Sequence, residues 1–154
     1  MESVLTSIEA SAAAQYLRGA RWAYAGVNGA HILGIALLVG AIIPLDLKLL
    51  GFWPRVDRQE LARVFVPMAA LGLGLAVCMG LLLFATRATE YADVTFFRFK
   101  LLLVLAGFIA AVLLHLRHGL LLQDAGARTL RAHALLSLAC WTGALACGRL
   151  IAFV

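Results

Sequence analysis

Hydrophobic and polar positions fall into long blocks along this chain. Four stretches contain no Asp, Glu, Lys or Arg: 22–45, 64–86, 101–116 and 132–148. About 20 apolar residues in a helix, each rising 1.5 Å, cross the hydrocarbon layer of a bilayer. With flanking residues added, the pattern predicts four membrane spans at about 22–46, 64–86, 97–117 and 130–152.

The spans are expected to be helices, because a backbone inside lipid must satisfy its own hydrogen bonds. The chain lacks the alternating ten-residue segments that are typical of an outer-membrane barrel. Connections between the spans are short, which favours antiparallel neighbours. We therefore predict an all-α fold, an integral membrane four-helix bundle that forms a single membrane domain over 1–154.

The first 20 residues differ from the rest of the chain. Leu5, Ile8 and Ala12 share one helical face, which predicts a short N-terminal interfacial helix over about 3–18. A secretory signal is not expected, because Glu2 stands where a basic start is usual and no long apolar core follows.

Composition agrees with a membrane protein: 64% of residues are hydrophobic, only 14% are charged, and the mean hydropathy is +0.97. Basic residues slightly favour the first and third loops, which predicts cytoplasmic loops and periplasmic termini in a bacterial inner (cytoplasmic) membrane. This bias accounts for the net charge of +5. The expected partner is the lipid bilayer, and no basic face interleaved with aromatic residues indicates nucleic acid.

The first span carries a histidine, His31, roughly a third of the way across the bilayer. An ionisable side chain at such a depth is costly, so a functional role is the default hypothesis. Helical depth places it in one half of the bilayer with three other side chains, namely Met79, Lys100 and Arg149. For Lys100 a second interpretation stays open, in which it extends to the headgroups.

A second polar group is predicted in the opposite half. His115 and His133 lie nine residues before and nine after a turn centred near Asp124, so an antiparallel pair brings them to the same depth. His118 is nearly one turn from His115, closer to water. For His118 and His133 a position at the interface without a ligand role stays open.

Histidines at two levels of a four-helix bundle favour b-type haem, since iron takes neutral imidazole as an axial ligand and the propionates take Arg or Lys. We predict one or two haems b. The proposed metal ligands are His31, His115 and His133, and the further cofactor-binding residues are Lys100 and Arg149. Stripes of small residues beside the histidines, such as Gly107 and Ala111, provide close helix packing or room for a flat macrocycle.

Several stretches carry a resemblance to known families. The run NGAHILGIALLVGAIIPLDLKLLG, then VFVPM, GLLLFA, Tyr91 and FFRFK at Phe96–Lys100 resemble an uncharacterised family of small four-helix bacterial inner-membrane proteins. More distantly, the histidine of the first span, the Pro-Met pair and the third-span lysine and histidine are similar to membrane protoporphyrinogen oxidases and copper-resistance D membrane proteins. The likeness to the oxidases implies haem or porphyrin binding by His31 and Lys100.

The function we expect is that of a cytochrome b-like, haem-binding membrane protein that carries electrons. It would exchange them with quinone and a periplasmic redox protein, or act as the anchor subunit of a larger membrane oxidoreductase. Two alternatives stay open: a porphyrin-modifying membrane oxidase, and a cofactor-free structural or transport subunit. Whether the chain is an enzyme is left open. Asp46 and Lys48, at the end of the first span, are expected to pair locally at the interface.

Overall fold

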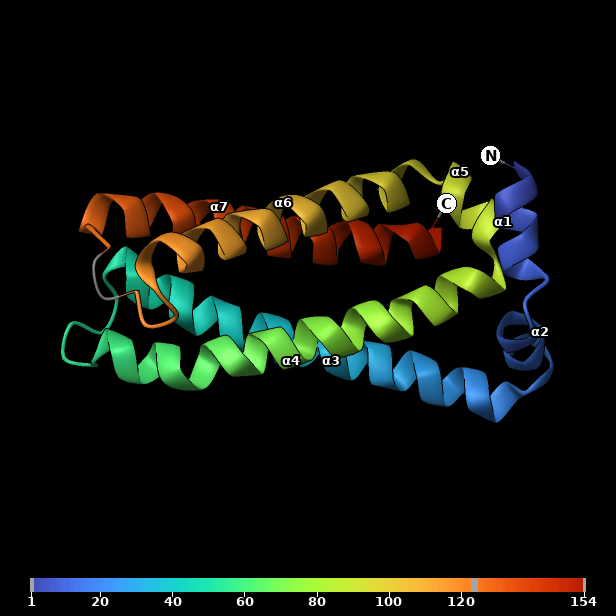
Figure 1. Cartoon of the computed structure of the whole chain (residues 1–154), viewed down its shortest axis with the longest axis horizontal. Helices are drawn as coiled ribbons and strands as arrows, with labels where there is room; N and C mark the ends of the chain where they lie inside the picture. The colour runs from blue at the N-terminus through green and yellow to red at the C-terminus, as the bar shows by residue number, and fades with distance from the viewer. Residues whose placement is uncertain (1, 123–124, 154) are drawn as a thin grey trace.

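The computed structural model describes residues 2–122 and 125–153, and all the regular structure in them is helical. Figure 1 shows the long helices side by side, with short helices at one end. The elements are α1 (Glu2–Glu9), α2 (Ala12–Gly19), α3 (Arg21–Leu50), α4 (Arg58–Thr86), α5 (Ala88–Asp93), α6 (Thr95–His118), α7 (Ala127–Leu150) and the 3₁₀ turn η1 (Ile151–Phe153).

Helices α3, α4, α6 and α7 are each long and apolar enough to cross a membrane. They alternate in direction, so that both chain termini lie at one end of the bundle and the starts of α4 and α7 lie at the other (Figure 1). The predicted all-α four-helix bundle is confirmed, and the chain is a multi-pass membrane protein. The turn expected near Asp124 lies outside the described residues.

The N-terminal segment differs from the single helix predicted over 3–18. It forms two helices, because Ser11 adopts an extended backbone conformation and its side chain accepts a hydrogen bond from the Ala14 N–H at 3.4 Å. Such a side chain replaces the missing intrahelical partner at a helix start. The six-residue α5 was not predicted, since it is too short to show a hydrophobic period.

Two capping residues, one at the end of α3 and one at the start of α4, set the length of the loop between these helices. Gly51 ends α3 with a φ of 112°, a left-handed conformation that costs glycine little. Asp57 begins α4, and its Oδ1 accepts from the backbone N–H groups of Gln59 and Glu60 at 2.8 and 3.0 Å. Helix α4 therefore starts six residues before the apolar run at Val64, and its first turns lie beyond the apolar segment.

Helices α3 and α4 form the closest pair, because two glycines face each other across their contact. A Cβ at Gly72 would lie 2.5 Å from the Leu38 backbone nitrogen and 2.8 Å from the Gly34 carbonyl oxygen. A Cβ at Gly34 would lie 2.5 Å from the Ala76 nitrogen. In lipid, where apolar burial does not drive association, such close backbone packing holds helices together.

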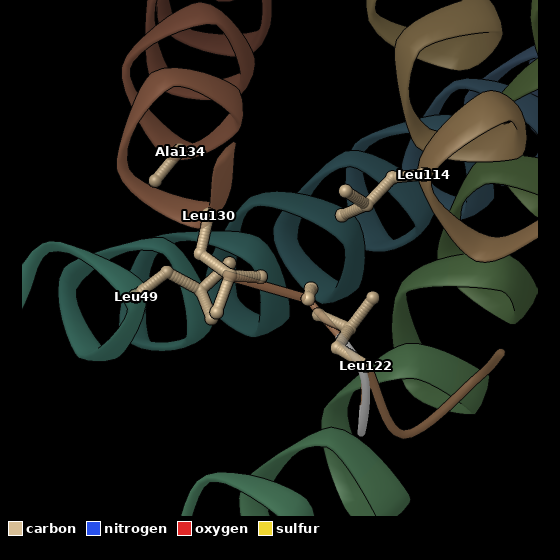
Figure 2. Packing of buried hydrophobic residues seen from close by; sticks show 6 residues of the cluster. Leu49, Leu114, Leu122, Leu130 and Ala134 are labelled. Carbon is tan, nitrogen blue, oxygen red and sulfur yellow. The ribbon is translucent and has the colours of Figure 1, made fainter. Parts of the chain in front are cut away.

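A second set of contacts joins α3, α6 and α7 at the end where α3 finishes. Figure 2 shows Leu49, Leu114, Leu130 and Ala134, which form one buried cluster with Leu122 from the segment after α6. The Leu122 side chain is 1% exposed. Its φ of 55° is unfavourable for a leucine. Burial of a leucine side chain contributes about 2 kcal/mol and offsets that cost.

The opposite end is covered by the N-terminal helices. The Glu9 carboxylate accepts from both the backbone N–H and the hydroxyl of Thr89, each at 2.7 Å, and so joins α1 to α5. Ala14 and Leu17 of α2 are buried, and α2 packs against α3 and α4. The two short helices thus close this end of the bundle.

The close packing of α3 against α4 predicts that alanine substitutions at two nearby positions of α4 differ in their effect on stability. Gly72→Ala forces α3 and α4 apart and is expected to cost about 1–3 kcal/mol of stability. Gly74→Ala is the matched control, because a Cβ at that position would meet no atom of another segment within 4 Å. Thermal unfolding in detergent measures both. Equal melting temperatures for the two variants would contradict the packing argument.

The Glu9 contact predicts a pH dependence. The two Thr89 hydrogen bonds lower the pKa of Glu9 from its usual 4.5, so the contact stabilises the folded state above that pH and is lost as pH falls through the lower, folded pKa. Hydrogen-exchange protection of α1 should therefore be lower at about pH 3 than at about pH 6, because Glu9 loses its charge in acid.

Glu9→Ala should show the low protection of α1 at every pH, whereas Glu2→Ala, an exposed position on the same helix, should behave as the unmodified protein. Protection that is constant across the range in the unmodified protein would show that Glu9 does not hold α1.

Candidate functional site

An apolar cavity of about 260 Å³ lies between the four long helices. Its walls are mainly leucine, valine and aromatic side chains, among them Leu73, Phe97 and Trp141. Of the side chains that line it, two are ionisable: His31 from α3 and Lys100 from α6. An apolar pocket with a few convergent polar groups is the usual form of a small-molecule site.

The cavity exists because the helices pack unevenly. Helix α3 packs against α4 and α7, and α6 packs against α7, whereas α4 and α6 do not pack against each other along the bundle. At the end near α5, the rings of Phe84 and Phe97 stack at 5.3 Å, with 3° between their planes. The cavity therefore lies between α4 and α6, and this aromatic pair closes one end of it.

His31 is held in one orientation by α4. Its Nδ1 lies 2.7 Å from the Ala76 carbonyl oxygen. A carbonyl can only accept, so Nδ1 carries the proton, and in the neutral ring Nε2 keeps its lone pair. Gly80 provides space for the ring, since a Cβ there would lie 3.0 Å from His31 Cε1. The result is an oriented imidazole with its second nitrogen unpartnered among the described residues.

Lys100 brings an ammonium group to the same cavity. Its side chain lies along Gly148 of α7, where a Cβ would be 3.6 Å from Nζ and 3.7 Å from Cε. Within the described residues, no carboxylate lies within 4.0 Å of its Nζ. Its charge and the His31 ring interact electrostatically. A cation without a counterion beside a neutral imidazole is suited to an anionic group of a ligand.

Arg149, the other cation predicted for this level, and the neighbouring Arg98 lie elsewhere. The Arg149 guanidinium lies 4.8 Å from the centre of the Phe153 ring and does not line the cavity. Arg98 donates to the Ala92 carbonyl at 2.7 Å and pairs with Asp93. Of the predicted basic residues, the structure thus brings Lys100 alone to His31.

The second group of predicted ligands, His115 and His133, comes from α6 and α7. His115 Nδ1 donates to the Gly119 carbonyl at 3.3 Å, beyond the end of α6. Both ring nitrogens of His133 are buried and have no hydrogen-bond partner in the part of the chain that the structure describes. The Ala110 backbone lies near the His133 ring, although it does not meet hydrogen-bond geometry, and the His115 ring interacts with His133 electrostatically. His118 is half-buried at the last residue of α6.

The structure buries the Asp46 side chain within the bundle, whereas the sequence predicts it at the interface. The sequence predicts a pair with Lys48 at the interface, but Asp46 is 3% exposed and faces the Ser137 hydroxyl on α7. Its Oδ2 has no hydrogen-bond partner among the described residues. Lys48 instead donates to the Trp53 carbonyl at 2.7 Å. Residues two apart on a helix point to different sides, so Asp46 turns inward where Lys48 turns outward.

The site can thus offer one nitrogen lone pair and one positive charge in an apolar space. Comparison with protein-family models, with curated proteins and with solved structures finds no match for this chain. No group of three or more His, Cys, Asp or Glu side chains with metal-binding geometry occurs in the described residues. The resemblances drawn from the sequence therefore remain hypotheses.

The position of Lys100 predicts a gain in stability when its charge is removed. A lysine at the centre of a membrane helix costs about 3 kcal/mol, and Lys100, in the second turn of α6, costs less than that; residues kept for function often lower stability. We expect Lys100→Met to raise the melting temperature in detergent, by a free energy of about 1 kcal/mol or more because the residue is only part-buried.

Lys48→Met is the control, because Lys48 has a hydrogen-bond partner at the helix end and its removal should bring no gain. A lower melting temperature for Lys100→Met would mean that the ammonium has a stabilising partner within the protein.

Proposed function

We propose that this chain is a multi-pass protein of the bacterial inner membrane that binds b-type haem at His31 and carries electrons. The observation that carries the proposal is the hydrogen bond from His31 Nδ1 to the Ala76 carbonyl. Histidines that bind metals through Nε2 usually donate Nδ1–H to a carbonyl or carboxylate, which fixes the tautomer and raises the basicity of the ligating nitrogen.

The other residues of the cavity agree with a haem site. Lys100 would pair with a propionate, and the aliphatic and aromatic walls would exclude water. The cavity volume of about 260 Å³ is just below the usual lower limit of about 300 Å³ for ligand pockets. A tetrapyrrole would therefore need the cavity to widen by separation of α6 from α4, two helices that do not pack on each other along the bundle.

Among the described residues, His31 is the one imidazole that lines this cavity, so we propose a single protein ligand to iron at this level. A bound haem supplies one-electron chemistry. The protein holds the macrocycle through His31, neutralises a carboxylate with Lys100, and keeps the site apolar. An exchange partner soluble in the bilayer, such as a quinone, fits the lateral position of the cavity.

A second haem at the other level rests on a separate observation. The two unpartnered ring nitrogens of His133 carry a desolvation cost that a metal ligand bond would offset. His115 on the facing helix is the second candidate ligand. Two redox centres at different depths would let electrons cross the membrane toward a periplasmic protein or another subunit of a larger oxidoreductase.

A porphyrin-modifying oxidase is the second candidate function. It is favoured by the presence of His31 and Lys100 in one cavity, since a porphyrin substrate also carries carboxylates and a flat apolar ring. Both functions need the same binding site, and they differ in whether the tetrapyrrole is turned over.

An absorption spectrum of the purified, reduced protein tests the proposal. We expect a Soret band after expression with haem precursors or after reconstitution with haem. His31→Ala should bind haem at least tenfold more weakly, a loss typical for a metal ligand (roughly 10- to 100-fold even for outer-shell partners). His118→Ala, which changes the same residue type outside the cavity, should bind as the unmodified protein does.

Lys100→Met should retain the Soret band with reduced affinity, because it removes a charge partner and leaves the iron ligand. Colourless protein that does not take up added haem would reject the haem-binding proposal. Turnover of a porphyrinogen by the folded protein would favour the oxidase over the electron carrier.

A further inference from the structure

A second cavity, of about 510 Å³, lies at the opposite end of the bundle from the N-terminal helices. It is built from two regions that are far apart in the sequence: residues 48–59, from the end of α3 to the start of α4, and the start of α7. This cavity is separate from the His31 site, with which it shares no lining residue.

The charge of this cavity is strongly positive. Among the described residues that line it are four cations and one carboxylate, namely Lys48, Arg55, Arg58, Arg131 and Asp57. The carboxylate is already engaged, because its Oδ1 accepts from two backbone N–H groups at the start of α4. Lys48 is oriented by its hydrogen bond to the Trp53 carbonyl. Of the described residues that line the cavity, Lys48, Arg55 and Arg131 alone outnumber this one engaged carboxylate.

Helix α7 adds to this positive potential. Its N-cap is Gly126, so no side chain caps the first turn, and Ala127 lines the cavity. The first N–H groups of a helix carry a partial positive charge and favour an anion. The helix start reinforces the guanidinium groups of Arg55 and Arg131, which come from two different segments of the chain.

An exposed apolar segment, here called the apolar rim, adjoins the cavity, and its Val56 is among the lining residues. Phe52, Trp53 and Val56 lie in the same segment between α3 and α4 and are 56%, 48% and 41% exposed. Aromatic side chains at the end of a membrane helix lie at the level of the lipid headgroups. The cavity thus combines a site for an anion with an adjoining surface for hydrocarbon, which matches the two parts of a phospholipid.

From this juxtaposition we propose that the cavity binds the phosphate-bearing headgroup of an anionic phospholipid, with the acyl chains against the apolar rim. Basic pockets at the ends of membrane helices recognise lipid phosphates in this way. The proposal does not depend on haem, and it concerns the opposite end of the bundle from the N-terminal helices. A bound lipid would join α3, α4 and α7 at this end and stabilise their arrangement.

The experiment measures lipid binding to the full chain in detergent. The probes are phosphatidylglycerol, phosphatidylcholine and inorganic phosphate, with native mass spectrometry and thermal unfolding as readouts. We expect phosphatidylglycerol to bind and raise the melting temperature, and phosphatidylcholine and inorganic phosphate to do so far less. Arg55→Gln with Arg131→Gln should weaken phosphatidylglycerol binding about thirtyfold, the effect expected from two basic residues.

The matched control is Arg63→Gln with Arg128→Gln. These two exposed arginines lie near the starts of α4 and α7 but do not line the cavity, so the control removes the same charge from the same end. It should keep the affinity for phosphatidylglycerol within about threefold, since diffuse attraction near the surface is screened by salt. Circular dichroism of both variants verifies that the helices are intact.

Equal loss of binding in both double variants would overturn the proposal. The loss would then reflect the total positive charge at this end of the bundle and not the residues that line the cavity. Phosphatidylcholine that binds as tightly as phosphatidylglycerol would also overturn the proposal, since the site would then not select for an anionic headgroup. Inorganic phosphate that competes fully with the lipid would assign the cavity to a free anion instead.

Discussion

The close contact between α3 and α4 is the constraint on which the described site depends. Gly34 and Gly72 allow the two backbones to approach until a single methyl group would not fit between them. Ala76 lies one turn further along α4, and at this separation its carbonyl oxygen reaches the His31 ring. With a larger residue at Gly72, the helices would separate and this hydrogen bond would lengthen. The orientation of the imidazole is therefore a consequence of glycine packing about one turn away along the helix, roughly 5 to 6 Å.

The buried polar groups of this bundle differ in whether their nitrogen and oxygen atoms have hydrogen-bond partners. His31 has one nitrogen bonded to a carbonyl and the other facing a cavity, an arrangement that suits a ligand. His133 and Asp46 have buried atoms with no partner among the described residues. In lipid, each such atom costs free energy, because water cannot replace the missing partner. Selection for stability alone would replace these groups with apolar ones, so their presence favours a functional reason at both levels of the bundle.

Much of the fold was predictable, since charge-free runs of 16 to 24 residues have few other uses than membrane spans. Helical depth also placed His31 and Lys100 in the same half of the bilayer, and they line one cavity. Depth does not give the direction in which a side chain points. It therefore could not show that Arg149 lies over Phe153 or that Asp46 faces Ser137. Those outcomes depend on which helices are neighbours, and antiparallel order alone does not decide whether α4 contacts α6.

Because α4 and α6 do not pack on each other along the bundle, a ligand would reach His31 by passing between these two helices. Helix α3 has two packed neighbours among the long helices, whereas α4 and α6 have one each. The Phe84 and Phe97 rings bridge α4 and α6 near α5, and such a pair contributes only about 0.5–1.5 kcal/mol beyond its burial. Small separations of α6 from α4 would thus widen the cavity without breaking a close helix pair or exposing polar backbone. The lowest-cost entrance lies on the side of the bundle, and a molecule that uses it must already be dissolved in the membrane.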